Sequence, residues 1–230
     1  MPLRKYLLFS PLRIAIHTGS WLPLIWLTWA YLSNHLTVNP IQAATQFTGR
    51  VAIILLVLSL ACTPINTLFH WGEVLRFRRA LGLYAFLYAA IHLYIVVGID
   101  YGFAFDLLWG DLNGKPYIYA GAASMLILVL LAVTSFRWWM KYLGKGWKRL
   151  HQLVYIAAPL AVLHYGWAKK GDFLALRGDI LQPLIYGIVV MILLIMRFPP
   201  IRKEIVRIRG VFSRWVHEVR ATFLHNISVE

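Results

Sequence analysis

The stretch RLHQLVYIAAPLAVLHYGW, residues 149–167, decides the fold class of this chain. Almost all of its side chains are apolar, and its length approaches the roughly 20 residues that a helix needs to cross a bilayer. It nevertheless contains His151 and His164. An ionisable side chain inside a membrane helix is costly and marks a functional site by default. The stretch therefore predicts a membrane protein whose histidines carry its chemistry.

The composition of the whole chain agrees with a membrane protein. Of its 230 residues, 60% are hydrophobic and only 14% are charged, whereas soluble domains average about 25% charged residues. The net charge of +14 would suit a nucleic-acid partner, but the basic residues lie between the apolar runs, so the lipid bilayer is the expected surrounding and nucleic acid is excluded. The single cysteine, Cys62, makes neither an internal disulfide nor a multi-cysteine metal site.

Apolar runs of membrane-spanning length recur along the chain. Backbone groups find no water partners in lipid, so each run must be helical. The sequence predicts an all-α polytopic fold, a bundle of six transmembrane helices at about residues 14–32, 51–69, 80–98, 117–136, 150–168 and 180–197.

The positions of the basic residues predict how this bundle is oriented. Most of the 23 lysines and arginines fall on one side, and cytoplasmic loops are enriched in these residues. Both termini are therefore expected in the cytoplasm. Residues 1–198 form the predicted membrane domain, and residues 199–230 a basic amphipathic tail on the anionic membrane face.

Two histidines are expected at one depth. His92 lies in the third predicted span and His164 in the fifth, at similar distances from the starts of two helices that run in the same direction. Two imidazoles at one level can clamp a haem between them, with the apolar bundle as the slot for the porphyrin. An iron with two axial histidines has no open position, which favours electron transfer over oxygen chemistry.

A second site is expected nearer the cytoplasmic side of the membrane than His92 and His164. It is called the inner level, and the depth of His92 and His164 the outer level. His151 precedes His164 by 13 residues, about 20 Å along a helix axis, although the two side chains would point about 140° apart on an ideal helix. Pro159 lies between them and is expected to alter the winding. The residue level with His151 on the third span is Arg78, which does not ligate iron in the usual way. This inner site could hold a differently ligated haem, a flavin, a quinone or nothing.

Three further side chains have two interpretations each. Arg50 could pair with a haem propionate or act as an interfacial anchor. Arg79, in a basic cluster near His151, could bind a flavin phosphate or simply follow the positive-inside rule. His17, in the first span, could line a quinone pocket or pack as an interfacial histidine.

Several stretches carry a family resemblance: FTGR (47–50), TPI (63–65), RRALGLYAFLYAAIHL (78–93), LGKGWKRLHQLVY (143–155) and LHYGW (163–167). The chain resembles the ferric-reductase-like transmembrane superfamily. Within it, the chain is similar to the haem-binding membrane subunits of bacterial periplasmic methionine sulfoxide reductase systems. Superfamily members typically carry two histidines on each of the two helices, and this chain has Arg78 in one of those places.

The resemblance implies a function for these residues. It implies haem b, with His92 and His164 as outer ligands and His151 and Arg78 at an altered inner site, and also flavin mononucleotide (FMN). It implies electron transfer from the quinone pool to a periplasmic molybdopterin reductase that repairs oxidised methionine in envelope proteins.

The sequence thus predicts a b-type cytochrome of the bacterial inner membrane, an electron-transfer subunit that is not itself the catalytic one. We recognise no nucleotide-binding unit, so electrons are expected from quinol or from a separate protein such as a cytoplasmic flavin reductase. Two alternatives remain: a metalloreductase that acts on ferric or cupric ions, and a small non-redox transporter.

Overall fold

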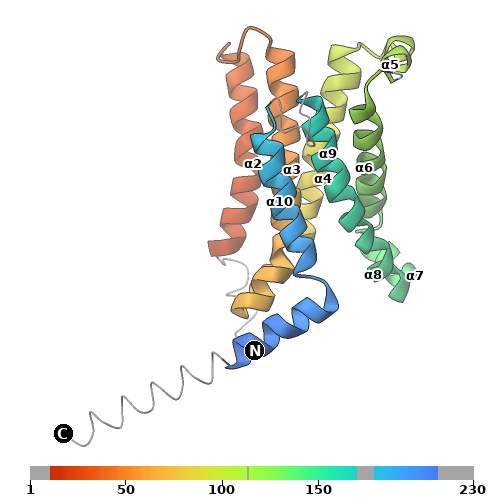
Figure 1. The fold of residues 1–230 in the computed structure, drawn as a ribbon. Coiled ribbons are helices and arrows are strands. Elements are labelled where there is room, and N and C mark those ends of the chain that lie inside the picture. The colour runs from red at the N-terminus through yellow and green to blue at the C-terminus, as the bar shows by residue number, and fades with distance from the viewer. Residues whose placement is uncertain (1–10, 113, 170–178, 212–230) are drawn as a thin grey trace, which may run out of the picture.

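The computed structural model describes residues 11–112, 114–169 and 179–211, and this part of the chain is helical without any strand (Figure 1). The all-α fold class is therefore confirmed. The longer helices are α2 (Pro11–Leu32), α3 (Pro40–Phe69), α4 (Arg78–Tyr94), α6 (Pro116–Val133), α9 (Val154–Ala168) and α10 (Leu181–Ile195). The shorter elements are η1 (Gly72–Arg76), the π-helix η2 (Ile95–Asp100), α5 (Phe105–Leu112), α7 (Arg137–Leu143), α8 (Lys145–Leu150) and the 3₁₀ turn η3 (His151–Leu153). A last helix, Pro199–Val211, is called the tail helix below.

Within the described residues, three helical segments are long and apolar enough to cross a membrane. They are α3, α4 together with its π-helical extension, and α6. The pair formed by α10 and the tail helix adds a fourth only if the 79° bend between them is a break within one span. Helices α9 and α10 have 15 residues each, fewer than the roughly 20 of a perpendicular crossing. The six-span count and the cytoplasmic termini stay predictions.

Helix α3 differs from its prediction at its start. It begins at Pro40, well before the expected residue 51. The side chain of Asn39 accepts a hydrogen bond from the Gln42 backbone N–H at 3.0 Å, and Pro40 occupies a first-turn position where no N–H is needed. As a result Arg50 lies about three turns inside the helix, where the sequence placed it at the helix head.

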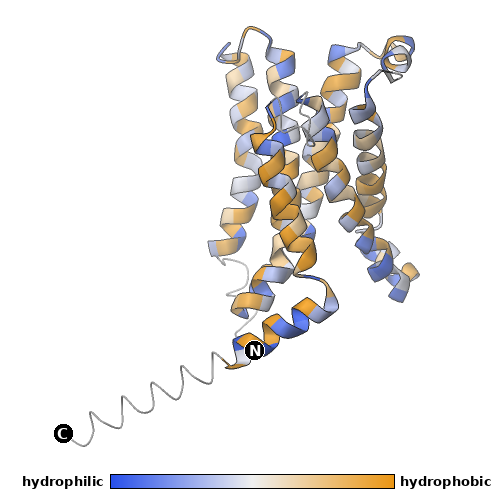
Figure 2. Ribbon diagram, in the orientation of Figure 1, coloured by the Kyte–Doolittle hydropathy of each residue, from blue (hydrophilic) through white to orange (hydrophobic). Residues whose placement is uncertain are grey.

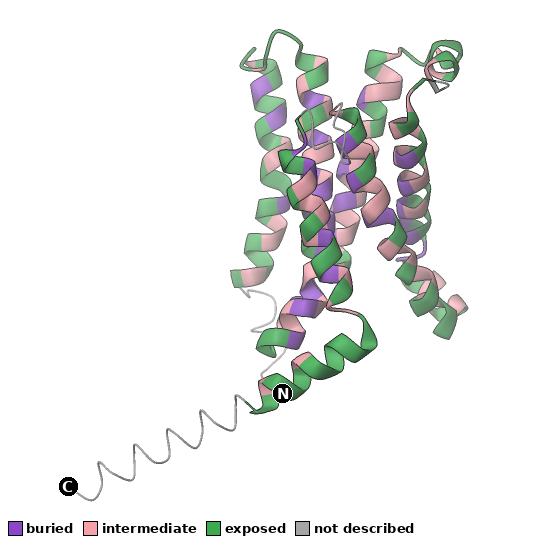
Figure 3. Cartoon of the chain, in the orientation of Figure 1, coloured by how far each residue is buried: buried purple, intermediate pink, exposed green. Residues whose placement is uncertain are grey.

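The helices associate in two pairs that share one core. Helix α3 packs chiefly on α4, α6 packs chiefly on α9, and α10 contacts both α9 and α3. Leu60 of α3, Tyr88 of α4 and Ala157 of α9 lie in this core with at most 1% of their surface exposed. Figure 3 shows buried residues on the facing sides of the helices and exposed residues on the outside.

The outer surface of the bundle is apolar. Ile185, Ile188 and Met191 of α10 each expose half or more of their surface, as expected of side chains that face lipid. Polar residues lie toward both ends of the bundle, and many of those at one end belong to α7, α8 and the tail helix (Figure 2). We call this the inner end, following the positive-inside prediction, and the opposite end the outer end.

Candidate metal centre

Two histidine rings face each other between α4 and α9. The ring centres of His92 and His164 lie 6.0 Å apart, and the ring planes cross at 87°. Both side chains are half-buried. The sequence predicted that His92 and His164 lie at the same depth, and the short distance between their rings agrees with this prediction.

Each ring is held by a backbone carbonyl of the neighbouring helix. The Nδ1 atom of His92 lies 2.9 Å from the Thr45 carbonyl oxygen of α3, and the Nδ1 atom of His164 lies 2.8 Å from the Tyr117 carbonyl oxygen of α6. A carbonyl oxygen can only accept, so each Nδ1 must carry the proton and donate. The neutral ring then has its lone pair on Nε2. Metal-binding histidines are commonly held in this way, because one ring nitrogen binds the metal while the other donates a hydrogen bond that fixes the ring.

A glycine makes room for each ring. A Cβ built on Gly121 would lie 2.5 Å from the Nδ1 atom of His164, and one built on Gly49 would lie 3.1 Å from the Nδ1 atom of His92. Gly49 and Gly121 each follow the accepting residue by four positions. The two rings are therefore seated in the same way on two different helices.

The geometry fits one metal ion shared by the two rings. With a metal–nitrogen bond of about 2 Å and about 1 Å from nitrogen to ring centre, two rings on opposite sides of one ion would have centres about 6 Å apart. The observed separation is 6.0 Å. No group of three or more histidine, cysteine or acidic side chains gathers in the described part of the chain. Two imidazoles alone suit a haem, in which the porphyrin supplies the other four nitrogens.

Arg50 presents an unsatisfied donor inside the bundle. Its Nε atom is buried and has no hydrogen-bond partner among the described residues. Buried donors are nearly always paired in folded proteins, so an acceptor is missing here. A carboxylate such as a haem propionate would supply it, because arginine binds carboxylates strongly.

The third histidine, His151, lies at the inner end of α9. Its Nε2 atom is 3.2 Å from the Thr134 hydroxyl oxygen, and its ring lies 4.1 Å from that of Trp147. The helical winding between His151 and His164 changes at the 3₁₀ turn His151–Leu153, which directly precedes α9. Pro159, which was expected to cause it, lies inside the regular helix α9.

Two arginines lie near His151, as the sequence predicted for this level. Arg78 and Arg79 are close enough to act electrostatically on the imidazole. The Arg78 backbone carbonyl accepts a hydrogen bond from the Ser59 hydroxyl at 2.8 Å, while the Arg79 guanidinium is exposed and lies 3.7 Å from the Met140 sulfur.

Arg197 belongs to the same level, although the sequence did not predict a role for it. Its guanidinium donates to the Tyr155 hydroxyl at 2.8 Å and to the Leu60 carbonyl oxygen, and it lies 5.1 Å from the centre of the Tyr155 ring. Its Nε atom is buried without a partner among the described residues. An arginine directly after an apolar run is usually interpreted as a membrane anchor. The sequence therefore did not distinguish Arg197 from the other basic residues that follow this run.

Comparison with known proteins identifies relatives over most of the chain. The family described as "Ferric reductase like transmembrane component" matches residues 48–162, which include Arg78, His92 and His151. A protein of Rhodospirillum rubrum is 40% identical over 84% of this chain and 90% of its own length. One from Caulobacter vibrioides is 39% identical over 76% of this chain and 80% of its own length, and one from Deinococcus radiodurans is 43% identical over 67% and 76%.

All three relatives carry one name, protein-methionine-sulfoxide reductase heme-binding subunit MsrQ. No solved structure is a significant match to the chain.

The fit of the His164 ring on α6 predicts the effect of adding one methyl group. Gly121→Ala places a Cβ 2.5 Å from Nδ1 and 2.9 Å from Cε1 of His164, so the rigid ring must move, at a cost of about 1–3 kcal/mol. We expect purified Gly121→Ala protein to lose haem or to show altered absorption bands. Gly49→Ala should act less strongly, because its nearest contact is 3.1 Å.

The matched control is Gly19→Ala on α2, where a Cβ would meet no atom within 4 Å. Haem content and spectra of Gly121→Ala that equal those of Gly19→Ala would contradict the seating of His164 on α6.

Proposed function

Because the chain belongs to the MsrQ family, the haem-binding subunits of protein-methionine-sulfoxide reductases, we propose that it works as a b-type cytochrome that passes electrons across the bacterial inner membrane. It is a membrane electron-transfer component of a methionine sulfoxide reductase system. We propose that its donor is quinol, or a cytoplasmic flavin reductase, and that its acceptor is the periplasmic molybdopterin reductase MsrP.

The observation that carries this proposal is the crossed pair of imidazoles. His92 and His164 would hold haem b through their Nε2 atoms, which have no hydrogen-bond partner among the described residues, while carbonyl oxygens fix both Nδ1 atoms. Bound haem takes up and releases one electron at a time. Two protein imidazoles bound to the iron would leave no position on it for a substrate, which suits electron transfer. Arg50 would pair with a propionate through the donor that is otherwise unsatisfied.

The inner level would hold an anionic group. Arg78, Arg79 and Arg197 bring three guanidinium groups near His151 and Tyr155, and no ion pair within the described residues neutralises any of them. The phosphate of FMN and the propionates of a second haem are both anions that arginine binds well. We propose that a redox group bound at this level exchanges electrons with the outer pair of histidines.

The family assignment disfavours both alternatives raised by the sequence. A non-redox transporter would not need a family-wide haem site, and the relatives are named as haem-binding subunits. A metalloreductase would act on free metal ions, whereas the relatives are named for methionine sulfoxide reduction.

We also propose that the tail helix lies on the inner surface of the membrane. It turns by 79° from α10, so it runs across the end of the bundle (Figure 1). The Arg209 guanidinium donates to the Thr67 carbonyl oxygen at the inner end of α3.

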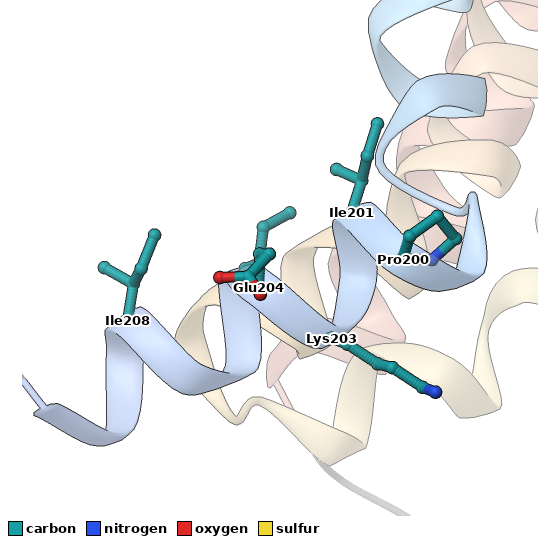
Figure 4. Close-up of a pocket in the computed structure, with 6 residues that line it drawn as sticks. Pro200, Ile201, Lys203, Glu204 and Ile208 are labelled. Atoms are coloured by element: carbon teal, nitrogen blue, oxygen red, sulfur yellow. The ribbon is translucent and has the colours of Figure 1, made fainter.

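A shallow hollow runs along the tail helix, lined by Pro200, Ile201, Lys203, Glu204, Ile205 and Ile208. In Figure 4 Ile201 and Ile208 point to one side of the helix and Lys203 points to another, as expected of an amphipathic helix on an anionic surface.

Removal of one axial ligand tests the proposed function. His164→Ala or His92→Ala should remove the haem held by this pair, since a single imidazole no longer clamps it. The measurement is the haem-to-protein ratio by pyridine haemochrome, with oxidised and reduced spectra. His35→Ala is the control, because the His35 imidazole is exposed, contacts only the Ser33 carbonyl and the Trp29 ring among the described residues, and lies outside the proposed centre. Unchanged haem content and spectrum in His164→Ala would overturn the assignment.

The position of the tail helix is testable by depth measurements on the full chain in vesicles of phosphatidylethanolamine and phosphatidylglycerol. Nitroxide labels at Ile208→Cys and Lys203→Cys, in a Cys62→Ala background, should report opposite environments. The label at position 208 should collide mainly with dissolved oxygen, which concentrates in lipid. The label at position 203 should collide mainly with a water-soluble nickel complex. Equal exposure of both labels to the nickel complex would contradict a helix lying in the interface.

A further inference from the structure

A histidine and a tyrosine meet between α2 and α4, apart from both levels described above. The Nδ1 atom of His17 lies 2.8 Å from the Tyr84 hydroxyl oxygen. The Trp21 ring completes the group, with its centre 5.9 Å from that of Tyr84 and its plane at 83° to the Tyr84 ring. His17 and Tyr84 are half-buried, and Trp21 exposes 45% of its surface. The group thus lies at the boundary between the helix bundle and its surroundings.

This boundary is open on the α2 side. Of the 22 residues of α2, only Ser20, Leu27 and Ala30 are buried. Farther along α2, Leu22 and Ile25 are apolar and more than half exposed. A lipid-soluble molecule could therefore reach His17 and Tyr84 from the acyl chains without passing through the packed core.

We infer that His17 and Tyr84 form the quinol-binding site of this chain, an inference that rests on the proposed quinol-linked function. The required chemistry is a pair of polar groups beside an apolar and aromatic surface, reachable from lipid. Trp21 and Tyr84 supply the aromatic surface for a quinol ring. The imidazole Nε2 atom and the tyrosine hydroxyl supply the hydrogen bonds.

The contact between Nδ1 and the hydroxyl lets the histidine serve both redox forms of the ligand. When Nδ1 carries the proton and donates to Tyr84, Nε2 is an acceptor and binds a quinol hydroxyl. When Tyr84 donates to Nδ1, Nε2 carries the proton and donates to a quinone carbonyl. A change of tautomer thus converts a quinol site into a quinone site without movement of the ring.

The site connects to the outer histidines through one face of α4. Tyr84, Tyr88 and His92 are spaced by four residues, so their side chains follow one another along the helix. Tyr88 is fully buried, and its hydroxyl donates to the Ser20 carbonyl oxygen of α2 at 2.7 Å. At 1.5 Å per residue, His92 lies about 12 Å from Tyr84 along the axis. Electrons therefore have a short, aromatic-lined route to the pair that would hold haem.

The proposed step balances in electrons and protons. Oxidation of one quinol to quinone releases two electrons and two protons. The electrons would leave singly, because a ferric haem held by His92 and His164 would be the acceptor and takes one electron at a time. One hydroxyl proton passes to Nε2 of His17, while the Nδ1 proton passes to Tyr84 and the tyrosine proton to water. The second hydroxyl gives its proton to water at the inner interface.

The test is a binding titration on the purified full chain in detergent. The probe is 2-heptyl-4-hydroxyquinoline N-oxide, a fluorescent quinol analogue whose emission is quenched on binding. We expect His17→Phe and Tyr84→Phe each to weaken binding by about tenfold, the scale of one lost hydrogen bond to the ligand. The control His35→Phe, at an exposed histidine of the α2–α3 loop, should bind like the wild type.

A second readout is the rate of haem reduction by a short-chain quinol, compared with reduction by dithionite. The two variants should be reduced slowly by quinol but normally by dithionite, with unchanged haem content. His164→Ala should lose haem and still bind the probe, which separates this site from the metal centre. Tyr84→Phe removes one oxygen atom only, so it remains informative if His17→Phe fails to fold.

The outcomes separate this inference from the proposed function. A wild type that neither binds the probe nor accepts electrons from quinol would overturn the quinol-linked function and this site with it. A wild type that does both, with His17→Phe and Tyr84→Phe equal to it, would keep the function and overturn the site. Weakened binding in both variants with normal dithionite reduction supports the site.

Discussion

The hydrogen bonds from two imidazole Nδ1 atoms to two backbone carbonyls are the constraint on which the centre depends. A helical carbonyl points along the axis toward the residue four positions later. A ring that bonds to it must therefore lie over that later residue, where any side chain would obstruct it. Gly49 follows Thr45, and Gly121 follows Tyr117, at this spacing. The same pairing of a carbonyl with a glycine, on α3 and on α6, thus seats the two rings whose centres lie 6.0 Å apart.

The sequence predicted the parts of this arrangement that depend on distance along a helix. The equal depth of His92 and His164 follows from counting residues on two parallel spans, and their rings lie 6.0 Å apart. What surrounds each ring could not be predicted in this way. Gly49 lies 43 residues before His92, and Gly121 lies 43 residues before His164. These contacts exist only because α3 pairs with α4 and α6 pairs with α9, and no local pattern states which helices become neighbours.

Charged residues were harder to interpret than histidines for a related reason. A membrane-embedded histidine is unusual on its own, whereas an arginine at the end of an apolar run is common. Arg197 therefore resembled its neighbours in sequence, although its guanidinium enters the bundle and contacts Tyr155 and Leu60. Arg50 was misplaced because the cap at Asn39 starts α3 early. The outer level thus has two matched imidazoles, while the inner level combines one imidazole with several guanidinium groups, so the two levels cannot share one ligation chemistry.

Electron paramagnetic resonance of the oxidised, purified protein tests the central claim most directly, because it reports how many imidazoles bind the iron and how their planes are oriented. Two axial imidazoles give low-spin ferric iron, and planes crossed at 87° predict a strongly anisotropic signal with one large g value. An ordinary rhombic low-spin signal would contradict the crossed orientation. A high-spin signal, from iron with an open or weakly filled axial position, would contradict the claim that His92 and His164 bind one haem iron together.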